Sequence, residues 1–256
     1  MAPTQPGGSQ FYGSQTADQV GLRGATLDRR RIEGVLEAVA LQAGGSLADR
    51  LCSAAAARLD ASGVGVSLGA RDALLETVCA TEGGREGESL QSDLGEGPSY
   101  SAHQFGWPVL VDDLKVDDSW PAFGPAAAGI GLHSIFAFPM RRGSVRIGAF
   151  TLYRQQAGEL SSDHHADALV FARFAVDLFL ALQSENPPDE LDQLFVDGTS
   201  NTVEIHQASG IVAVQLGIAV GAALAMLRAH AYTEQRSLRE IADDVVARRL
   251  QMNDDR

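Results

Sequence analysis

Hydrophobic positions recur with two spacings along the first part of the chain and predict two kinds of element. Apolar residues three to four apart predict helices at about 28–42 and 46–59, separated by Gly44-Gly45. Alternating and β-branched residues over 61–68 and 74–80 predict a pair of strands. The fold therefore begins with helices and continues into a sheet.

The same spacings predict more strands and a long helix up to about residue 184. The Gly/Glu-rich stretch 82–88 is interpreted as a loop, and the Gly-Pro step at 97–98 favours a helix after it. Three short strands are expected at 108–111, 133–138 and 145–153. The capping residue types of Ser161-Ser-Asp163 are expected to open the long helix.

The long helix carries apolar residues around most of its circumference, whereas a helix on a sheet needs only one apolar stripe. These residues are Leu169, Val170, Phe171, Phe174, Val176, Leu178, Phe179, Leu180 and Leu182. Two explanations stay open. The helix packs on its copy in a second subunit, or it is buried within its own domain.

The pattern changes at the paired prolines 187–188, which mark a linker. Beyond them the periodicity is wholly helical, and Ser237 with Glu240 forms the capping box of the last helix. Three helices with short connections can share one small core. The predicted fold class is α+β: an antiparallel sheet flanked by helices, followed by an all-α three-helix domain. The predicted divisions are a disordered tail 1–26, a domain 27–185 that contains the sheet, a linker 186–200 and a helical domain 201–251.

Charge separates the two parts of the chain. The net charge is −13 overall; residues 1–200 hold 14 basic and 26 acidic residues, a net of −12. Residues 201–251 hold five arginines and five acidic residues, a net of zero. Because contacts to phosphate need basic residues, only the second part is a candidate for binding nucleic acid.

Several function classes lack their sequence signals. No apolar run approaches the roughly 20 residues of a membrane span, and no secretory signal is evident, which predicts a soluble, cytoplasmic protein. Two cysteines are too few for a disulfide framework or a closed zinc site. No phosphate loop, nucleophile elbow or zinc-protease motif is present. We therefore expect no enzyme, no metal site and no cofactor.

Two resemblances cover residues 32–251. Five segments resemble the GAF domain of actinobacterial regulators: 94–101, 108–114, 120–123, 135–140 and 146–154. Three segments are similar to the ANTAR domain of RNA-binding transcription antiterminators: 206–217, 223–232 and 238–250. The resemblance implies a sensor for a small-molecule effector, joined to a module that binds RNA stem-loops in leader transcripts. It also implies a homodimer, which would double the contacts to RNA.

The RNA-binding residues expected from this resemblance lie in the helical domain. Arg228 and Arg236 are the strongest candidates, and Gln207, Ser209, Tyr232 and Arg239 could add hydrogen bonds or stacking to exposed bases. The alternative is that the arginines only pair with neighbouring acidic residues.

A ligand pocket of the sensor is the second site hypothesis. Its candidate lining residues are Cys79, Tyr100, Trp107, Trp120, Phe123, Phe136, Phe138 and Phe150. The alternative is that these residues form the ordinary core of the domain.

Two other functions stay open. One is a DNA-binding transcription factor with a recognition helix over 237–250. The other is a protein-interaction module whose tail binds no nucleic acid, because many ANTAR domains carry lysine where this chain has Ser209.

Overall fold

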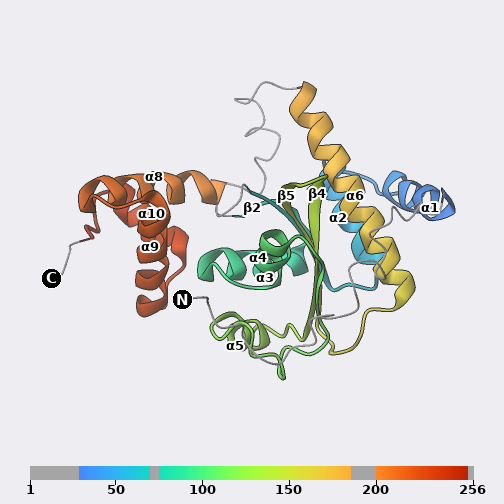
Figure 1. Ribbon diagram of the computed structural model, residues 1–256, viewed down its shortest axis with the longest axis horizontal. Helices are drawn as coiled ribbons and strands as arrows, with labels where there is room; N and C mark the ends of the chain where they lie inside the picture. The colour runs from blue at the N-terminus through green and yellow to red at the C-terminus, as the bar shows by residue number, and fades with distance from the viewer. Residues whose placement is uncertain (1–28, 70–74, 186–199, 253–256) are drawn as a thin grey trace.

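A computed structural model describes residues 29–69, 75–185 and 200–252 (Figure 1). It contains an antiparallel sheet with helices on both faces and a tail of three helices beside it. The predicted fold class is therefore confirmed. The predicted disordered tail 1–26 and nearly all of the predicted linker 186–200 lie outside the described residues.

The sheet has five strands in the order β2-β1-β5-β4-β3, with all neighbours antiparallel. The strands are β1 Gly63–Leu68, β2 Glu76–Ala80, β3 Val109–Val111, β4 Ser134–Arg142 and β5 Val145–Arg154. All five lie where the period-two pattern predicted them. Successive side chains point to opposite faces of a strand, so each strand contributes to two different cores.

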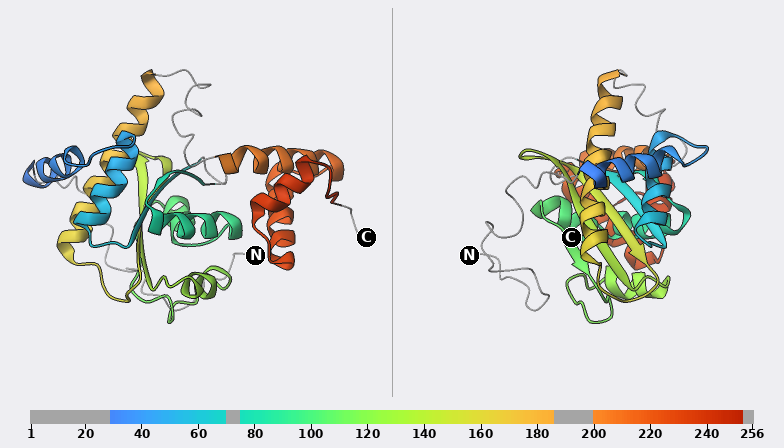
Figure 2. Two further views of the ribbon diagram at one scale, coloured as in Figure 1. Left: turned by 180° about the vertical axis from the view of Figure 1, so that it is seen from behind. Right: turned by 90° about the vertical axis from the view of Figure 1, so that its right-hand side faces the viewer.

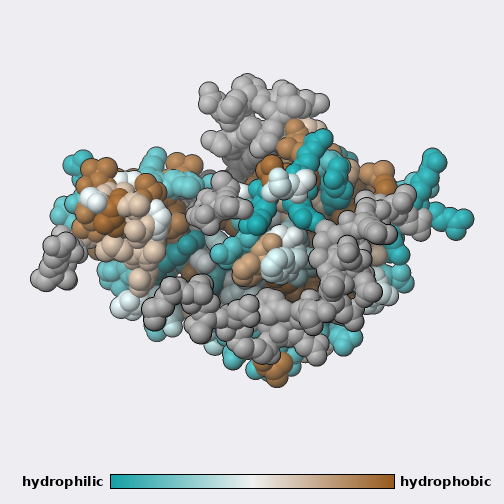
Figure 3. Space-filling view, viewed as in Figure 1, coloured by the Kyte–Doolittle hydropathy of each residue, from teal (hydrophilic) through white to brown (hydrophobic). Residues whose placement is uncertain are grey.

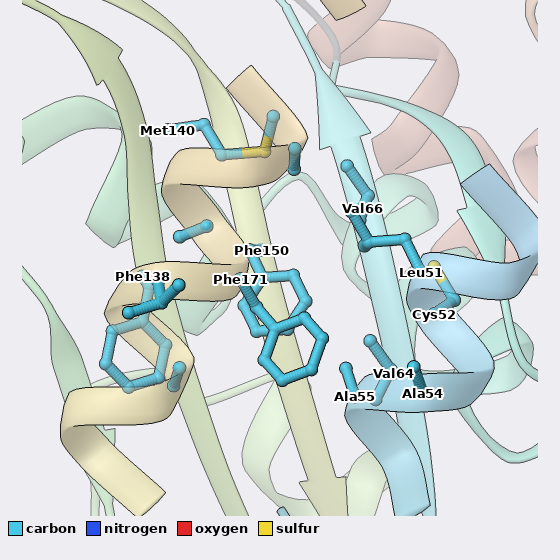
Figure 4. Close-up of a cluster of buried hydrophobic side chains, with 14 of the residues drawn as sticks. Leu51, Cys52, Ala54, Ala55, Val64, Val66, Phe138, Met140, Phe150 and Phe171 are labelled. Atoms are coloured by element: carbon cyan, nitrogen blue, oxygen red, sulfur yellow. The ribbon is translucent and has the colours of Figure 1, made fainter. Parts of the chain in front are cut away.

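Two helices cover one face of the sheet, α2 Leu47–Arg58 and α6 Ser162–Glu185, and α1 Arg29–Ala40 packs against both of them (Figure 1). Beneath them lies the main core, in which Phe150 stacks on Phe171 with ring centroids 6.1 Å apart (Figure 4). Cys52 of α2 and Cys79 of β2 form a disulfide at the edge of this core. The two cysteines thus join a helix to the outermost strand.

Helix α6 buries most of its circumference within its own domain, because the sheet, α1 and α2 all pack against it. Of its nine apolar residues, only Leu169 is substantially exposed, at 40%. Intramolecular packing therefore accounts for nearly all of the broad apolar surface. A second subunit at this helix stays a prediction.

The opposite face of the sheet is covered by α3 Glu82–Leu94, α4 Pro98–Phe105 and α5 Phe123–Gly129. The interpretation of 82–88 as a loop is wrong, because these residues form the start of α3. The helix tolerates its glycines because it lies directly on strand β1. A Cβ atom on Gly84 would lie 2.2 Å from the carbonyl oxygen of Val64, so only glycine allows this approach.

The tail consists of α8 Ser200–Leu216, α9 Val220–Glu234 and α10 Leu238–Val246, which share a small core (Figure 2). The predicted capping box of Ser237 and Glu240 is confirmed. The last helix ends at Val246, four residues before the end of the recognition helix that was expected over 237–250. In Figures 1 and 2 the tail lies beside α3 and α4, on the side of the molecule away from α6.

Taken one at a time, the described helices are too short or too polar to cross a membrane. Only α8 and α9 meet the length and composition criteria when combined, and these two are bent by 107° at their junction.

The close approach of α3 to β1 yields a test by mutation. Gly84→Ala should lower the free energy of unfolding by about 1–3 kcal/mol, because the added methyl overpacks a backbone contact. Urea unfolding followed by circular dichroism measures the change. Gly129→Ala in α5 is the control, since nothing lies within 4 Å of its Cβ position, and it should change stability by less than about 0.5 kcal/mol. Equal effects of the two substitutions would contradict this account.

Candidate functional site

The residues expected to bind RNA are distributed over different environments of the tail. Gln207 is exposed on α8, and Tyr232 on α9 is 66% exposed. Ser209 is only 2% exposed, and its hydroxyl donates a hydrogen bond to the carbonyl oxygen of Ile205 at 2.7 Å. The expectation that Ser209 contacts RNA is therefore wrong, because the side chain points into the tail and bonds to its own helix.

Arg228 faces the sheet domain rather than solvent. Its Nε donates to the carbonyl oxygen of Ser92 at 3.2 Å, and its Nη2 donates to the Tyr100 hydroxyl at 3.1 Å. The guanidinium also lies over the Tyr100 ring, 5.7 Å from the centroid, which is a cation–π geometry. A strong RNA-binding candidate and a candidate pocket residue thus bind each other across the two parts of the molecule.

A second contact joins the start of α10 to the end of α3. The backbone N–H of Leu238 donates to Oδ1 of Asp93 at 3.3 Å. Burial raises the pKa of Asp93 to about 6, an effect that Glu240 increases and that the Leu238 hydrogen bond and the Arg228 charge oppose. At neutral pH the carboxylate is therefore ionised at a cost in free energy, and it faces the positive end of a helix.

A third contact pairs His206 of α8 with Glu76 of β2, with Nε2 and Oε1 3.0 Å apart. This hydrogen bond and the charge of Glu76 raise the pKa of His206 above its usual value. The carboxyl groups of Glu76 and Asp93 both belong to the sheet domain, so the tail contacts acidic side chains at two points.

Arg236 is held by acidic residues of the tail itself. Its guanidinium lies 2.7 Å from Asp244 and 3.4 Å from Glu234, and Arg249 contacts the same Asp244 carboxylate at 2.7 Å. Arg239 lies 3.9 Å from Asp243 on the next turn of α10. These pairs are the alternative arrangement that the sequence left open for the arginines.

The outer face of α8 is apolar and slightly hollowed. Gln207, Gly210, Ile211, Val214 and Gln215 line an open hollow of about 540 Å³. Figure 3 shows apolar side chains gathered at the end of the molecule that the tail forms. Val214 is 86% exposed, so this face has no partner among the described residues.

The eight residues proposed to line one ligand pocket do not lie together, so that expectation is wrong. Phe136, Phe138, Phe150 and Cys79 belong to the core under α2 and α6. The reason is strand alternation, because residues two apart on a strand share a face.

The other four lie on the far side of the sheet or at its periphery. Phe123 is buried in a second core with Tyr153, and the indole of Trp120 donates to Ser101 at 3.1 Å. Trp107 is 51% exposed and stacks on Phe105. Tyr100 holds Arg228, as described above. These aromatics are core, interface or surface residues, not the wall of one cavity.

A buried polar network between α3, α4 and the sheet was missed by the sequence analysis. Gln91 donates to the Ser99 hydroxyl at 2.7 Å and to the Tyr153 hydroxyl at 2.6 Å. Tyr153 in turn donates to Glu88 at 2.8 Å, and Ser99 contacts Thr151 at 2.8 Å. Burial raises the pKa of Glu88, so this carboxyl favours its protonated form more than an exposed one does.

The only available signal for this network was the i, i+3 spacing of Glu88 and Gln91 behind closely spaced glycines. Among the described residues, no group of three or more histidine, cysteine or acidic side chains is arranged to hold a metal ion.

Comparison with protein families matches residues 200–246 to the ANTAR domain. No curated protein matches the chain. Among solved structures, it is similar to the GAF domain of a phosphoenolpyruvate-protein phosphotransferase from Coxiella burnetii (11% identity, 61% of this chain and 94% of that chain, TM-score 0.46).

It is also similar to the GAF domain of the Acinetobacter phosphoenolpyruvate-protein phosphotransferase (9% identity, 60% and 94%, TM-score 0.47). A third similar structure is the free methionine-R-sulfoxide reductase from Neisseria meningitidis in complex with its substrate (17% identity, 62% and 91%, TM-score 0.43).

The buried Asp93 carboxyl predicts a pH dependence of stability. Its pKa is raised on folding, so the folded protein binds more protons than the unfolded chain between about pH 4 and 6, and stability falls as pH rises through that window. Asp93→Asn removes this dependence. Relative to wild type, the variant should gain about 2–3 kcal/mol in unfolding free energy between pH 4 and pH 7.5.

Urea unfolding at the two pH values measures this difference. Asp117→Asn is the matched control, because Asp117 accepts a backbone N–H within its own loop, from Ser119 at 2.9 Å. A pH-independent difference between wild type and Asp93→Asn would show that the Asp93 pKa is not raised.

Proposed function

We propose that this chain is a regulator that binds stem-loop RNA through its helical tail under the control of its sheet domain. The observation that carries the proposal is the match of residues 200–246 to the ANTAR domain, over the three helices of the tail. The bound RNA is a leader transcript whose stem-loops, once held, exclude a competing terminator fold. The protein acts as a homodimer in a cytoplasmic setting.

The chemistry of the tail supports single-stranded loops rather than a regular duplex as the target. Loops expose base faces and edges, which stack on aromatic rings and bond to amides. Tyr232 and Gln207 are exposed groups of these two kinds. A third candidate for RNA binding, Arg239, has a half-exposed side chain. With a net charge of zero over residues 201–251, the tail has little non-specific attraction for phosphate.

A DNA-binding function has weaker support. Helix α10 has nine residues, and its polar positions carry one arginine, Arg239, against three acidic residues that would repel phosphates across a groove: Glu240, Asp243 and Asp244. A protein-interaction function has one observation in its favour. The apolar hollow on α8 is unlike a phosphate-binding surface and resembles the centre of a protein interface.

Gel-shift titration of the full-length protein separates these functions. The probes are a tandem stem-loop RNA and a duplex DNA of equal length, each at about 50 and 200 mM salt. RNA should bind more tightly at both salt concentrations, with a shallow salt dependence because the tail is uncharged overall. Preference for duplex DNA, or binding of neither probe, would overturn the proposal.

Tyr232→Ala should weaken RNA binding about tenfold, since stacking of a base on an aromatic ring contributes roughly 1–3 kcal/mol. Tyr232→Phe is the matched control, because it keeps the ring and should stay within about twofold of wild type. The dissociation constants come from the same titration. If the two variants bind equally well, Tyr232 does not stack on RNA.

A further inference from the structure

We propose that the sheet domain inhibits RNA binding by presenting to the tail a surface that imitates RNA. We name this contact the latch. On the tail it consists of Arg228 and Leu238, and on the sheet domain of Ser92, Asp93 and Tyr100. This inference rests on the proposed function and concerns its regulation.

Each sheet-domain member of the latch offers a chemical group that RNA also offers. The Asp93 carboxylate takes the place of a phosphate at the start of α10, where the Leu238 N–H donates to it. The Ser92 carbonyl oxygen takes the place of a base or sugar oxygen, and the Tyr100 ring that of a base face beneath a guanidinium. An Arg228 guanidinium engaged in this way cannot donate the same N–H groups to a transcript.

The geometry leaves little room for Arg228 to serve both partners at once. A Cβ atom on Gly95 would lie 2.4 Å from Nη1 of Arg228, so the guanidinium rests directly on the turn between α3 and α4. Gly95 itself has φ 69°, the left-handed conformation that lets the chain reverse there. RNA can reach Arg228 only after the tail moves away from this turn.

Charge adds to the steric block. The described residues of the sheet domain, 29–69 and 75–185, hold 12 basic and 19 acidic residues, a net charge of −7, and the latch places the tail against this acidic domain. A phosphate backbone approaching the closed tail meets repulsion that falls when the tail separates, because screened charges act over about 8–10 Å.

The sheet side of the latch is held from within the domain. Gln91 and Ser99 point inward to the buried polar network, and their neighbours Ser92 and Tyr100 hold the tail. The amide N–H of Ser99 donates to Gln91 at 2.8 Å, which ties α4 to α3. The two helices thus carry the network on one side and the latch on the other, and a change inside the sensor shifts the groups that hold Arg228.

The test compares the full-length wild type with Asp93→Ala/Tyr100→Phe, which weakens the latch from the sheet side and leaves every tail residue intact. Asp117→Ala is the control, since Asp117 lies outside the latch and accepts a backbone N–H within its own loop of the sheet domain. Tyr100→Phe alone keeps the ring in place, and it gives a smaller effect in the same direction should the double variant fold poorly.

Two quantities are measured: hydrogen exchange of α9, Val220–Glu234, and the dissociation constant for tandem stem-loop RNA. Loss of the latch should speed exchange in α9 and lower the apparent dissociation constant roughly tenfold, because affinity scales with the fraction of open protein. RNA added to wild type should speed exchange at 90–100, where the sheet domain is released.

The outcomes separate the two proposals. Faster exchange with unchanged RNA affinity overturns the latch and leaves RNA binding standing. RNA binding by neither wild type nor the open variant overturns the proposed function, and the latch with it. Unchanged exchange in all variants shows that Asp93 and Tyr100 do not hold the tail, and it also overturns the latch.

Discussion

The direct packing of α3 on strand β1 is the constraint on which the rest of the structure depends. Backbone approaches backbone at Gly84, so the helix lies too close to the sheet for any larger side chain. This closeness lets Glu88 and Gln91 reach the inner strands β1 and β5, and it leaves the last turn of the helix free to meet the tail. One helix therefore connects the interior of the sheet domain to the helical tail.

Electrostatics explains why the proposed latch can open. Arg228 is half buried, and its partners are a carbonyl oxygen, a hydroxyl and a ring, with the Asp93 carboxylate nearby. Interactions of this kind contribute only about 0.5–3 kcal/mol each, because both sides give up water to form them. A contact of that strength can be displaced by a ligand with better-placed groups of the same chemistry.

Predictions from the sequence succeeded where local rules govern and failed where distant segments meet. The hairpin of β4 and β5 and the capping box at Ser237 depend on neighbours in the chain, and both were found. Helix α3 was missed because its glycines, poor helix formers in isolation, are required by packing on β1. The proposed pocket failed because residue type alone does not tell which face of a strand a phenylalanine occupies.

What the sequence determined by itself is the order and kind of most elements, the charge difference between the two parts, and the resemblance of the tail to the ANTAR domain. The tertiary structure decided which arginines are accessible. Arg228 lies against Tyr100, 128 residues away along the chain, and Arg236 lies on Asp244. The physical reason is that the periodicity of a sequence reports burial on a single element, whereas the partner of a charged side chain depends on how separate elements pack together.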